Sequence, residues 1–181
     1  MNRLTSPPWT IYVDGSCLGN QNVEASTPAA WAVVIITGDT GLGRGSGSLV
    51  EEFAGPVVTD PSAEDFVGAE VGSNNTAELT AFGEALRWLL IEGGGEEAVI
   101  RADSQYAGNL ASGAWKAKAN KALVAHVQEL WRAVAALRPI SWDHVRAHRG
   151  HRWNERADHL ALRKANNEPP VPLTFWKPGQ R

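Results

Sequence analysis

Four acidic residues stand where the sequence predicts that strands or helices begin or end. Asp14 closes one apolar run, and Asp103 closes another. Glu78 lies in the first turn of a predicted helix, and Asp158 lies in the last predicted helix. Ligand clefts in open α/β sheets form at the ends of strands, so this placement is informative. Each residue alone also has a structural explanation, as a turn residue, a helix cap or an exposed helix residue.

Taken together, the four carboxylates predict a metal site. Four carboxylates about 5 Å apart repel one another by roughly 3 kcal/mol per pair at an effective dielectric constant of about 20. Cations or protons must offset such repulsion, and hard divalent ions with oxygen ligands meet that need. Mg²⁺ binds carboxylates together with substrate phosphate and fits better than a closed Ca²⁺ site. Two such ions about 3.5–4 Å apart can activate a water and stabilise the leaving oxygen of a phosphodiester.

The elements that must position these residues include both strands and helices. Runs of β-branched and aromatic residues predict strands at 9–13, 29–37, 98–102 and 140–145. Apolar residues at helical spacing predict helices at 76–92, briefly after 103, across 123–137 and at 154–165. This order predicts one α/β domain in which helices flank a mixed sheet.

Two segments of unusual composition lie between the early strands and the first helix. Residues 41–48 are rich in glycine but lack the Lys-Ser/Thr ending of a phosphate loop, so they predict a flexible hairpin turn or a strand edge. Residues 51–72 are acidic and interrupted by prolines and glycines. They predict a long surface excursion around at most one further strand.

The composition is that of an ordinary single domain. The chain has 181 residues, of which 43% are hydrophobic and 20% are charged. Cys17 is the only cysteine, which excludes an internal disulfide framework and is compatible with a reducing compartment. Residues 1–8 contain no apolar signal region, and no apolar run of about 18 residues occurs, so secretion and membrane spanning are disfavoured.

The net charge of -3 by itself disfavours a nucleic-acid partner, but the charges are unevenly distributed. Residues 1–100 carry 3 basic and 14 acidic side chains, whereas residues 101–164 carry 12 basic and 5 acidic ones. A solvated face is the ordinary explanation of such a bias. The basic half is nevertheless compatible with contacts to a phosphate backbone.

Four strings of the sequence match motifs of one enzyme family in that family's order. They are YVDGSCLGN at 12–20, SNNTAEL at 73–79, ADSQY at 102–106 and VRAHRGHRWNERAD at 145–158. Over about residues 9–165 the chain resembles type 1 ribonuclease H, which cuts the RNA strand of RNA/DNA hybrids. The resemblance implies the ribonuclease H-like fold, with a five-stranded mixed sheet flanked by helices.

The resemblance also implies roles for individual residues. It makes Asp14, Glu78, Asp103 and Asp158 the metal-binding catalytic carboxylates, with two Mg²⁺ ions that Mn²⁺ can replace. His148 corresponds to a mobile-loop histidine that assists proton movement or product departure; its ordinary explanation is a surface loop residue. Residues expected to contact the hybrid are Gly15, Cys17, Asn20, Ser73, Asn74, Asn75 and Gln105. Ser73 has a second explanation as a helix cap.

The chain departs from the family pattern in two places. Only eight residues separate Tyr106 from Trp115, too few for the basic helical handle of some bacterial members. Lys116, Lys118 and Lys121 follow at once, and the shorter basic surface predicts weaker binding with a shallower salt dependence. The acidic insertion at about 51–72 is longer than in compact members.

The sequence therefore predicts an endonuclease that hydrolyses hybrid RNA and leaves 5′-phosphate and 3′-hydroxyl ends. We expect an extension at 1–8, a catalytic domain at 9–166 and a Pro-rich tail at 167–181. We expect a handle-less or short-handle bacterial or phage-like member of the family, monomeric, cytoplasmic and without a membrane partner. The alternatives are a DNA nuclease or recombinase of the same fold, a non-catalytic hybrid-binding module, and a fragment of a polyprotein such as a reverse transcriptase.

Overall fold

Residues 7–181 are described by a computed structural model, and this part of the chain folds into one sheet with helices on both faces. Its strands are β1 (Trp9–Cys17), β2 (Ala29–Thr37), β3 (Ser48–Pro56), β4 (Ala98–Ala102) and β5 (Ile140–His144). Its helices are α1 (Asn74–Ile91), α2 (Gln105–Ala111), α3 (Lys121–Leu137) and α4 (Arg152–Ala165).

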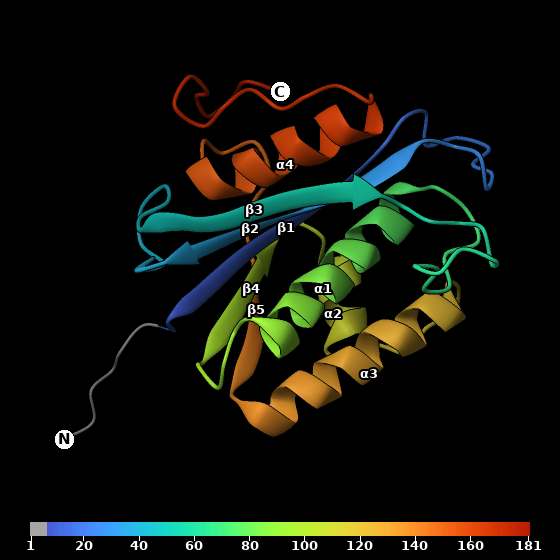
Figure 1. The fold of residues 1–181 in the computed structure, drawn as a ribbon, viewed down its shortest axis with the longest axis horizontal. Coiled ribbons are helices and arrows are strands. Elements are labelled where there is room, and N and C mark those ends of the chain that lie inside the picture. The colour runs from blue at the N-terminus through green and yellow to red at the C-terminus, as the bar shows by residue number, and fades with distance from the viewer. Residues whose placement is uncertain (1–6) are drawn as a thin grey trace.

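The sheet is mixed and has the strand order β3-β2-β1-β4-β5, as Figure 1 shows. The pairs β1–β2 and β2–β3 are antiparallel, whereas β1–β4 and β4–β5 are parallel. The five-stranded mixed sheet expected from the sequence is confirmed. Val13 on β1 pairs with Ala102 on β4, and this register brings the next residues, Asp14 and Asp103, to the same end of the sheet.

Each face of the sheet carries its own apolar cluster. Helices α1, α2 and α3 cover one face, and α4 with the following tail covers the other (Figure 1). Side chains alternate along β1, so that Ile11 and Val13 belong to the first cluster and Tyr12 belongs to the second. The central strand β1 is therefore buried on both sides, which fixes the position of the residues that follow Val13.

The predicted places of Asp14 at the end of its strand and of Glu78 in the first turn of its helix were wrong. β1 continues to Cys17, so Asp14 lies within the strand because Asp14 to Cys17 keep pairing with β2. α1 begins at Asn74 because Ser73 caps it, with Ser73 Oγ accepting a hydrogen bond from Thr76 N at 3.0 Å. Glu78 consequently lies in the second turn of α1, where it is buried.

The acidic insertion begins within β3 and continues into a long packed loop, residues 57–73. Val57 N donates to Ala29 O at 2.9 Å, and Gly72 N donates to Glu24 O at 2.9 Å, so both ends of the loop are tied to neighbouring segments. Ala69 is 1% exposed and belongs to the core between the sheet, α1 and α3. The prediction of at most one further strand is confirmed by β3, and the loop covers one end of the α1–α3 layer.

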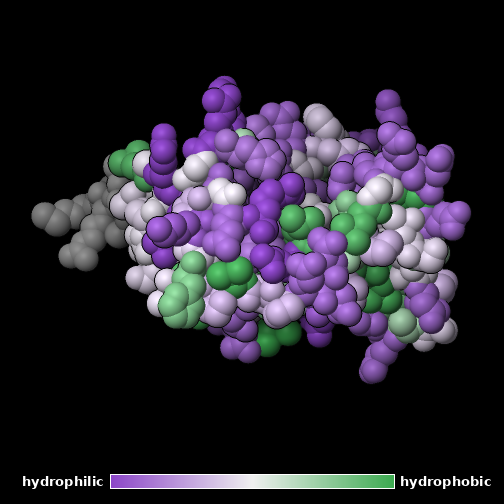
Figure 2. Space-filling view, turned by 90° about the horizontal axis from the view of Figure 1, so that it is seen from above, coloured by the Kyte–Doolittle hydropathy of each residue, from purple (hydrophilic) through white to green (hydrophobic). Residues whose placement is uncertain are grey.

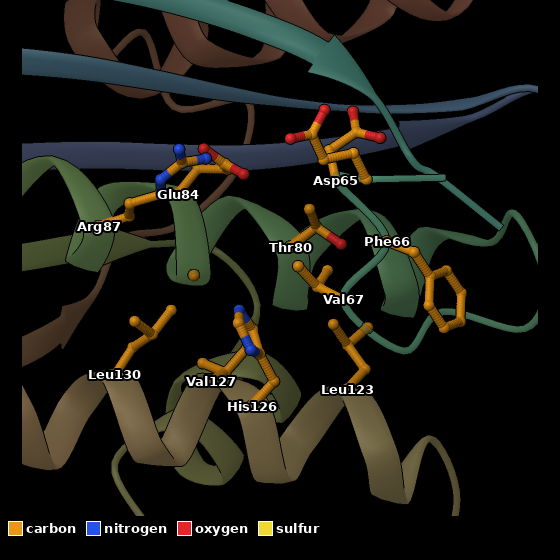
Figure 3. Close-up of a pocket in the computed structure, with 12 residues that line it drawn as sticks. Asp65, Phe66, Val67, Thr80, Glu84, Arg87, Leu123, His126, Val127 and Leu130 are labelled. Atoms are coloured by element: carbon orange, nitrogen blue, oxygen red, sulfur yellow. The ribbon is translucent and has the colours of Figure 1, made fainter. Parts of the chain in front are cut away.

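This loop, α1 and α3 line a half-open pocket of about 810 Å³ (Figure 3). Glu84 and Arg87 reach its rim from α1, His126 reaches it from α3, and Asp65 reaches it from the loop. The four predicted catalytic carboxylates all lie outside its lining. Burial raises the pKa of Glu84, and this effect is larger than the opposing one of the Arg87 charge.

The tail, residues 167–181, lies against the outer face of α4 (Figure 1). Trp176 is 5% exposed, which shows that the tail is packed onto the domain. The face made by α4 and the tail is mostly hydrophilic, with small separate apolar patches (Figure 2). No helix within residues 7–181 has both the length and the apolar content needed to cross a bilayer.

Candidate active site

Three of the four predicted carboxylates converge at the end of the sheet. Asp14 comes from β1, Glu78 comes from the second turn of α1, and Asp103 directly follows β4. Each offers one carboxylate oxygen, and these oxygens all lie within 4.8 Å of one another. Asp14 is 3% exposed and Glu78 is 8% exposed, whereas Asp103 is half-buried.

Gly15 allows α1 to approach β1 this closely. A Cβ atom at Gly15 would lie 2.5 Å from Glu78 N and 2.6 Å from Ala77 C, closer than non-bonded atoms can pack. The atoms in the way belong to the backbone of α1, so they cannot rotate aside. Gly15 N also donates a hydrogen bond to Asp14 Oδ1 at 2.9 Å, which orients that carboxylate. The glycine is thus required by the geometry of the carboxylate cluster.

Burial and mutual repulsion make the charged form of this cluster costly. Burial, followed by the charge of Glu78, raises the pKa of Asp14 well above its usual value. Burial also raises the pKa of Glu78 to about 8, against the smaller opposing effect of a hydrogen bond with Asp14. Both carboxyl groups are therefore harder to ionise than free carboxyl groups unless a cation is present.

The pKa of Asp103 is also raised overall, but more groups oppose the increase. Burial and the charge of Asp158 raise its pKa, whereas a hydrogen bond with Asn154 and the charges of His148 and His144 lower it. His144 Nε2 also lies 3.2 Å from the backbone oxygen of Asp103. Polar groups from β5, α4 and the loop between them therefore surround this carboxylate.

Asp158 lies on α4 and lines the same cleft, but it is paired with the tail. Arg181 Nε donates to Asp158 Oδ2 at 2.9 Å, and Arg181 Nη2 donates to Asp158 Oδ1 at 3.1 Å. The Asp158 side chain is 16% exposed and the Arg181 side chain is 53% exposed. The predicted set of four thus consists of a tight group of three and a fourth carboxylate held by an arginine.

The cleft around these residues has a volume of about 480 Å³. Gly15, Cys17 and Asn74, three of the residues expected to contact the substrate, line it. Cys17 Sγ lies 3.6 Å from Gly72 O, and burial raises the pKa of its thiol. Ser16 also lines the cleft.

The other expected substrate contacts surround the cleft without lining it. Asn20 Oδ1 accepts a hydrogen bond from Asn74 N at 3.1 Å, which joins the loop after β1 to the start of α1. Asn75 and Gln105 are exposed in the first turns of α1 and α2. Ser73 is 8% exposed and its hydroxyl is used as the α1 cap, so the structural explanation of this residue holds.

His148 lies in the loop between β5 and α4. It is exposed and has a φ of 56°, a left-handed conformation that is uncommon outside glycine. The structure places its charge close enough to Asp103 to affect that carboxyl group. The catalytic role expected of His148 stays a prediction.

Two residues of this region were missed by sequence reasoning. Asn154 is 2% exposed, lowers the pKa of Asp103 and stands four residues before Asp158 on α4. Its i, i+4 spacing from Asp158 was a signal that could have identified it. Arg181 gave no local signal, because its place in the cleft depends on the path of the whole tail.

The donor set of the carboxylate cluster suits a hard cation. All of its oxygens come from carboxylates, the ligand type that Mg²⁺, Mn²⁺ and Ca²⁺ prefer. Glu78 Oε2 is buried and has no hydrogen-bond partner among the described residues. Such an oxygen lacks the partner that burial normally demands, and a bound cation would supply it. The cluster could therefore hold a metal ion.

A parallel–antiparallel sheet of this order, with acidic side chains at the end of its central strands, defines an α/β enzyme of the ribonuclease H-like fold. The family model described as RNase H matches residues 6–166. The chain belongs to the ribonuclease H family, and it is an endoribonuclease of that family.

A curated relative supports this assignment, and solved structures show the same fold. The ribonuclease H of Thermosynechococcus vestitus is 33% identical over 171 residues, covering 88% of this chain and 89% of the relative. RNase H1 of the archaeon Halobacterium salinarum NRC-1 is 24% identical with a TM-score of 0.63, covering 88% of this chain and 98% of that one. LC11-RNase H1, solved in complex with an RNA/DNA hybrid, is 22% identical with a TM-score of 0.63. The match covers 88% of this chain and 97% of that one.

Proposed function

We propose that this enzyme hydrolyses the RNA strand of RNA/DNA hybrids with two divalent ions, and that Mg²⁺ is the physiological metal. The products are 5′-phosphate and 3′-hydroxyl ends. The observation that carries the proposal is the buried carboxylate cluster of Asp14, Glu78 and Asp103, which is unfavourable in its charged form without a cation. A protein that only bound the hybrid would gain nothing from such a cluster.

In this proposal the carboxylates hold the ions and the rest of the site orients them. Asp14, Glu78 and Asp103 hold metal through their clustered oxygens, and Asp158 completes the set from α4. The bound ions would activate a water and stabilise the charge that develops on the leaving oxygen. Asn154 orients Asp103, and Gly15 N orients Asp14. His148 exchanges a proton or helps the product leave from its exposed loop.

Exposed amides support recognition of the RNA strand. Asn20, Asn74, Asn75 and Gln105 are all exposed beside the cleft, on the loop after β1 and on the first turns of α1 and α2. Amide side chains both donate and accept hydrogen bonds, as a 2′-hydroxyl requires. Contacts of this kind let a protein distinguish RNA from DNA.

A second concave surface supports binding of the nucleic-acid backbone. It lies between the segment after α2 and the first turns of α3, and its volume is about 840 Å³. Trp115 and Trp131 line it together with Lys116, Lys121 and Arg132. Lysines neutralise phosphates and indole rings stack on bases or sugars. Here α2 is followed directly by a short connection to α3, which takes the place of the basic handle.

The test is cleavage of a labelled hybrid in Mg²⁺ and in Mn²⁺, with the product ends mapped. We expect cleavage of the RNA strand alone and a loss of at least a thousandfold in Asp14→Asn, a substitution that keeps the side-chain size. The exposed carboxylate variant Glu70→Gln is the matched control and should cleave like the wild type. Cleavage that survives Asp14→Asn would contradict the proposal, and equal cutting of duplex DNA would favour a DNA nuclease of this fold.

Three further expectations stay predictions. We infer that the enzyme is cytoplasmic and that it acts as a monomer. We also retain residues 9–166 as the catalytic domain, with the tail as an addition to it. Light scattering during size-exclusion chromatography measures the oligomeric state directly.

A further inference from the structure

The tail places a positive charge in the proposed metal site. Arg181 lines the same cleft as Asp14, Glu78, Asp103 and Asp158. Its guanidinium group donates to both carboxylate oxygens of Asp158, at 2.9 Å and 3.1 Å. Hydrogen bonds between two charged groups in this forked geometry are stronger and more directional than those of a single donor. The oxygens of Asp158 are thus already engaged by a cation that belongs to the chain.

Packing against α4 holds the tail along the path that delivers Arg181. Val171 N donates to His159 Nε2 at 2.9 Å, and Arg156 Nη1 donates to Val171 O at 2.7 Å. The Trp176 ring is buried, and the Arg156 guanidinium carbon lies 5.3 Å from its centre. Arg156 itself is 1% exposed and bonds Glu52 of β3 through two nitrogens, at 2.8 Å and 2.6 Å.

The last residues of the tail are also ordered by internal contacts. Trp176 Nε1 donates to Gln180 O at 2.8 Å, which turns the chain back toward α4 just before Arg181. Arg163 Nη2 donates to Arg181 O at 3.4 Å from the last turn of the helix. Arg181 therefore reaches Asp158 from a backbone held by hydrogen bonds, and the entropy lost on forming the pair is chiefly the rotamer freedom of the arginine side chain.

The positive charge of Arg181 offsets part of the negative charge of the carboxylates in this cleft. Four acidic groups face this cleft, and Arg181 is the cation that touches one of them directly. A divalent ion bound by Asp158 must displace the guanidinium or bind beside a like charge. Both routes weaken metal binding, because the first breaks two charge-assisted hydrogen bonds and the second adds repulsion.

We propose that Arg181 is a metal-competing residue of the active site, which occupies Asp158 until a divalent ion displaces it. This inference rests on the proposed function, because it assumes that Asp158 is a metal ligand. The tail then sets the concentration of divalent ion at which the site becomes complete. The pair is partly exposed, so its effect is limited, and we expect about a fivefold weakening of metal binding relative to a chain without it.

Titration of the protein with Mn²⁺ in the absence of nucleic acid tests this, with free Mn²⁺ measured by electron paramagnetic resonance. Arg181→Ala removes the competitor, and Lys177→Ala is the control because it removes one exposed positive charge from the same tail. We expect the Mn²⁺ Kd of Arg181→Ala to be about fivefold lower than that of the wild type. The Kd of Lys177→Ala should stay within twofold of the wild-type value.

The outcomes separate this inference from the proposed function. An unchanged or higher Kd in Arg181→Ala overturns the inference, and so does an equal decrease in both variants, which would reflect net charge alone. In both cases the proposed function still stands if Asp14→Asn loses Mn²⁺ binding. Failure of the wild type to bind Mn²⁺, or binding that Asp14→Asn does not affect, overturns the proposed function and the inference with it.

Discussion

Replacing Glu78 by glutamine should stabilise the metal-free protein at alkaline pH while removing its activity. Burial raises the pKa of Glu78 from 4.5 to about 8. Between these values the folded state holds a proton that the unfolded chain has released, so stability falls as the pH rises through this range. Glutamine has nearly the same shape but does not ionise, and its amide can donate to the neighbouring Asp14.

The magnitude follows from the geometry of the cluster. Two unit charges within 4.8 Å of each other repel by at least about 3 kcal/mol at an effective dielectric constant of about 20. The full pKa shift corresponds to a ceiling of about 5 kcal/mol at pH 8. We therefore expect Glu78→Gln to be more stable than the wild type by about 3 kcal/mol at pH 8. In a chain of this size that difference raises Tm by roughly 6–12 °C.

Thermal unfolding followed by circular dichroism in the presence of a chelator measures this difference. The gain of Glu78→Gln should shrink to under about 1 kcal/mol at pH 5, where Glu78 is protonated in the folded state. Glu70→Gln, at an exposed position, should leave Tm unchanged at both pH values. A Glu78→Gln variant that is no more stable than the wild type at pH 8, or equally stabilised at pH 5, would refute the electrostatic reasoning.

Three other predictions concern separate parts of the site. Gly15→Ala should cost about 1–3 kcal/mol of stability and at least tenfold in hybrid cleavage, measured by urea unfolding and initial rates, because its Cβ would collide with the α1 backbone at Glu78. His148→Ala should lower kcat roughly ten- to a hundredfold with Tm unchanged, and an unchanged kcat would remove His148 from the mechanism. The double variant Lys116→Ala/Lys121→Ala should reduce the slope of log Kd against log salt by roughly 1–2 in hybrid binding, and an unaltered slope would exclude this surface from backbone contact.

Much of the sheet was predictable because its strands carry strong local signals. The β-branched runs of β2 and β4 are bounded by turn residues, and both strands have the expected ends. β1 was predicted too short, since Gly15 has a low strand propensity that pairing with β2 overrides. α1 begins two residues earlier than expected because its capping box uses Thr76 at the third position in place of Glu or Gln.

The sequence was enough to identify the residues of the candidate site, but it predicted only part of how they are arranged in space. The motifs identified Asp14, Glu78 and Asp103, and the parallel pairing of β1 with β4 explains why they meet. The pairing of Asp158 with Arg181 has no counterpart in local sequence. It depends on contacts of the tail with α4 and β3, which connect residues far apart in the chain.

The parallel pairing of β1 and β4 also determines when the site can exist during folding. Asp14 and Asp103 become neighbours only after a long-range crossover through β2, β3 and α1 has formed, and Asp158 joins only after α4 has docked. Contacts of such high sequence separation form slowly and break in global rather than local unfolding. A divalent ion held there would therefore slow amide hydrogen exchange across the central strands, far beyond the residues that touch it.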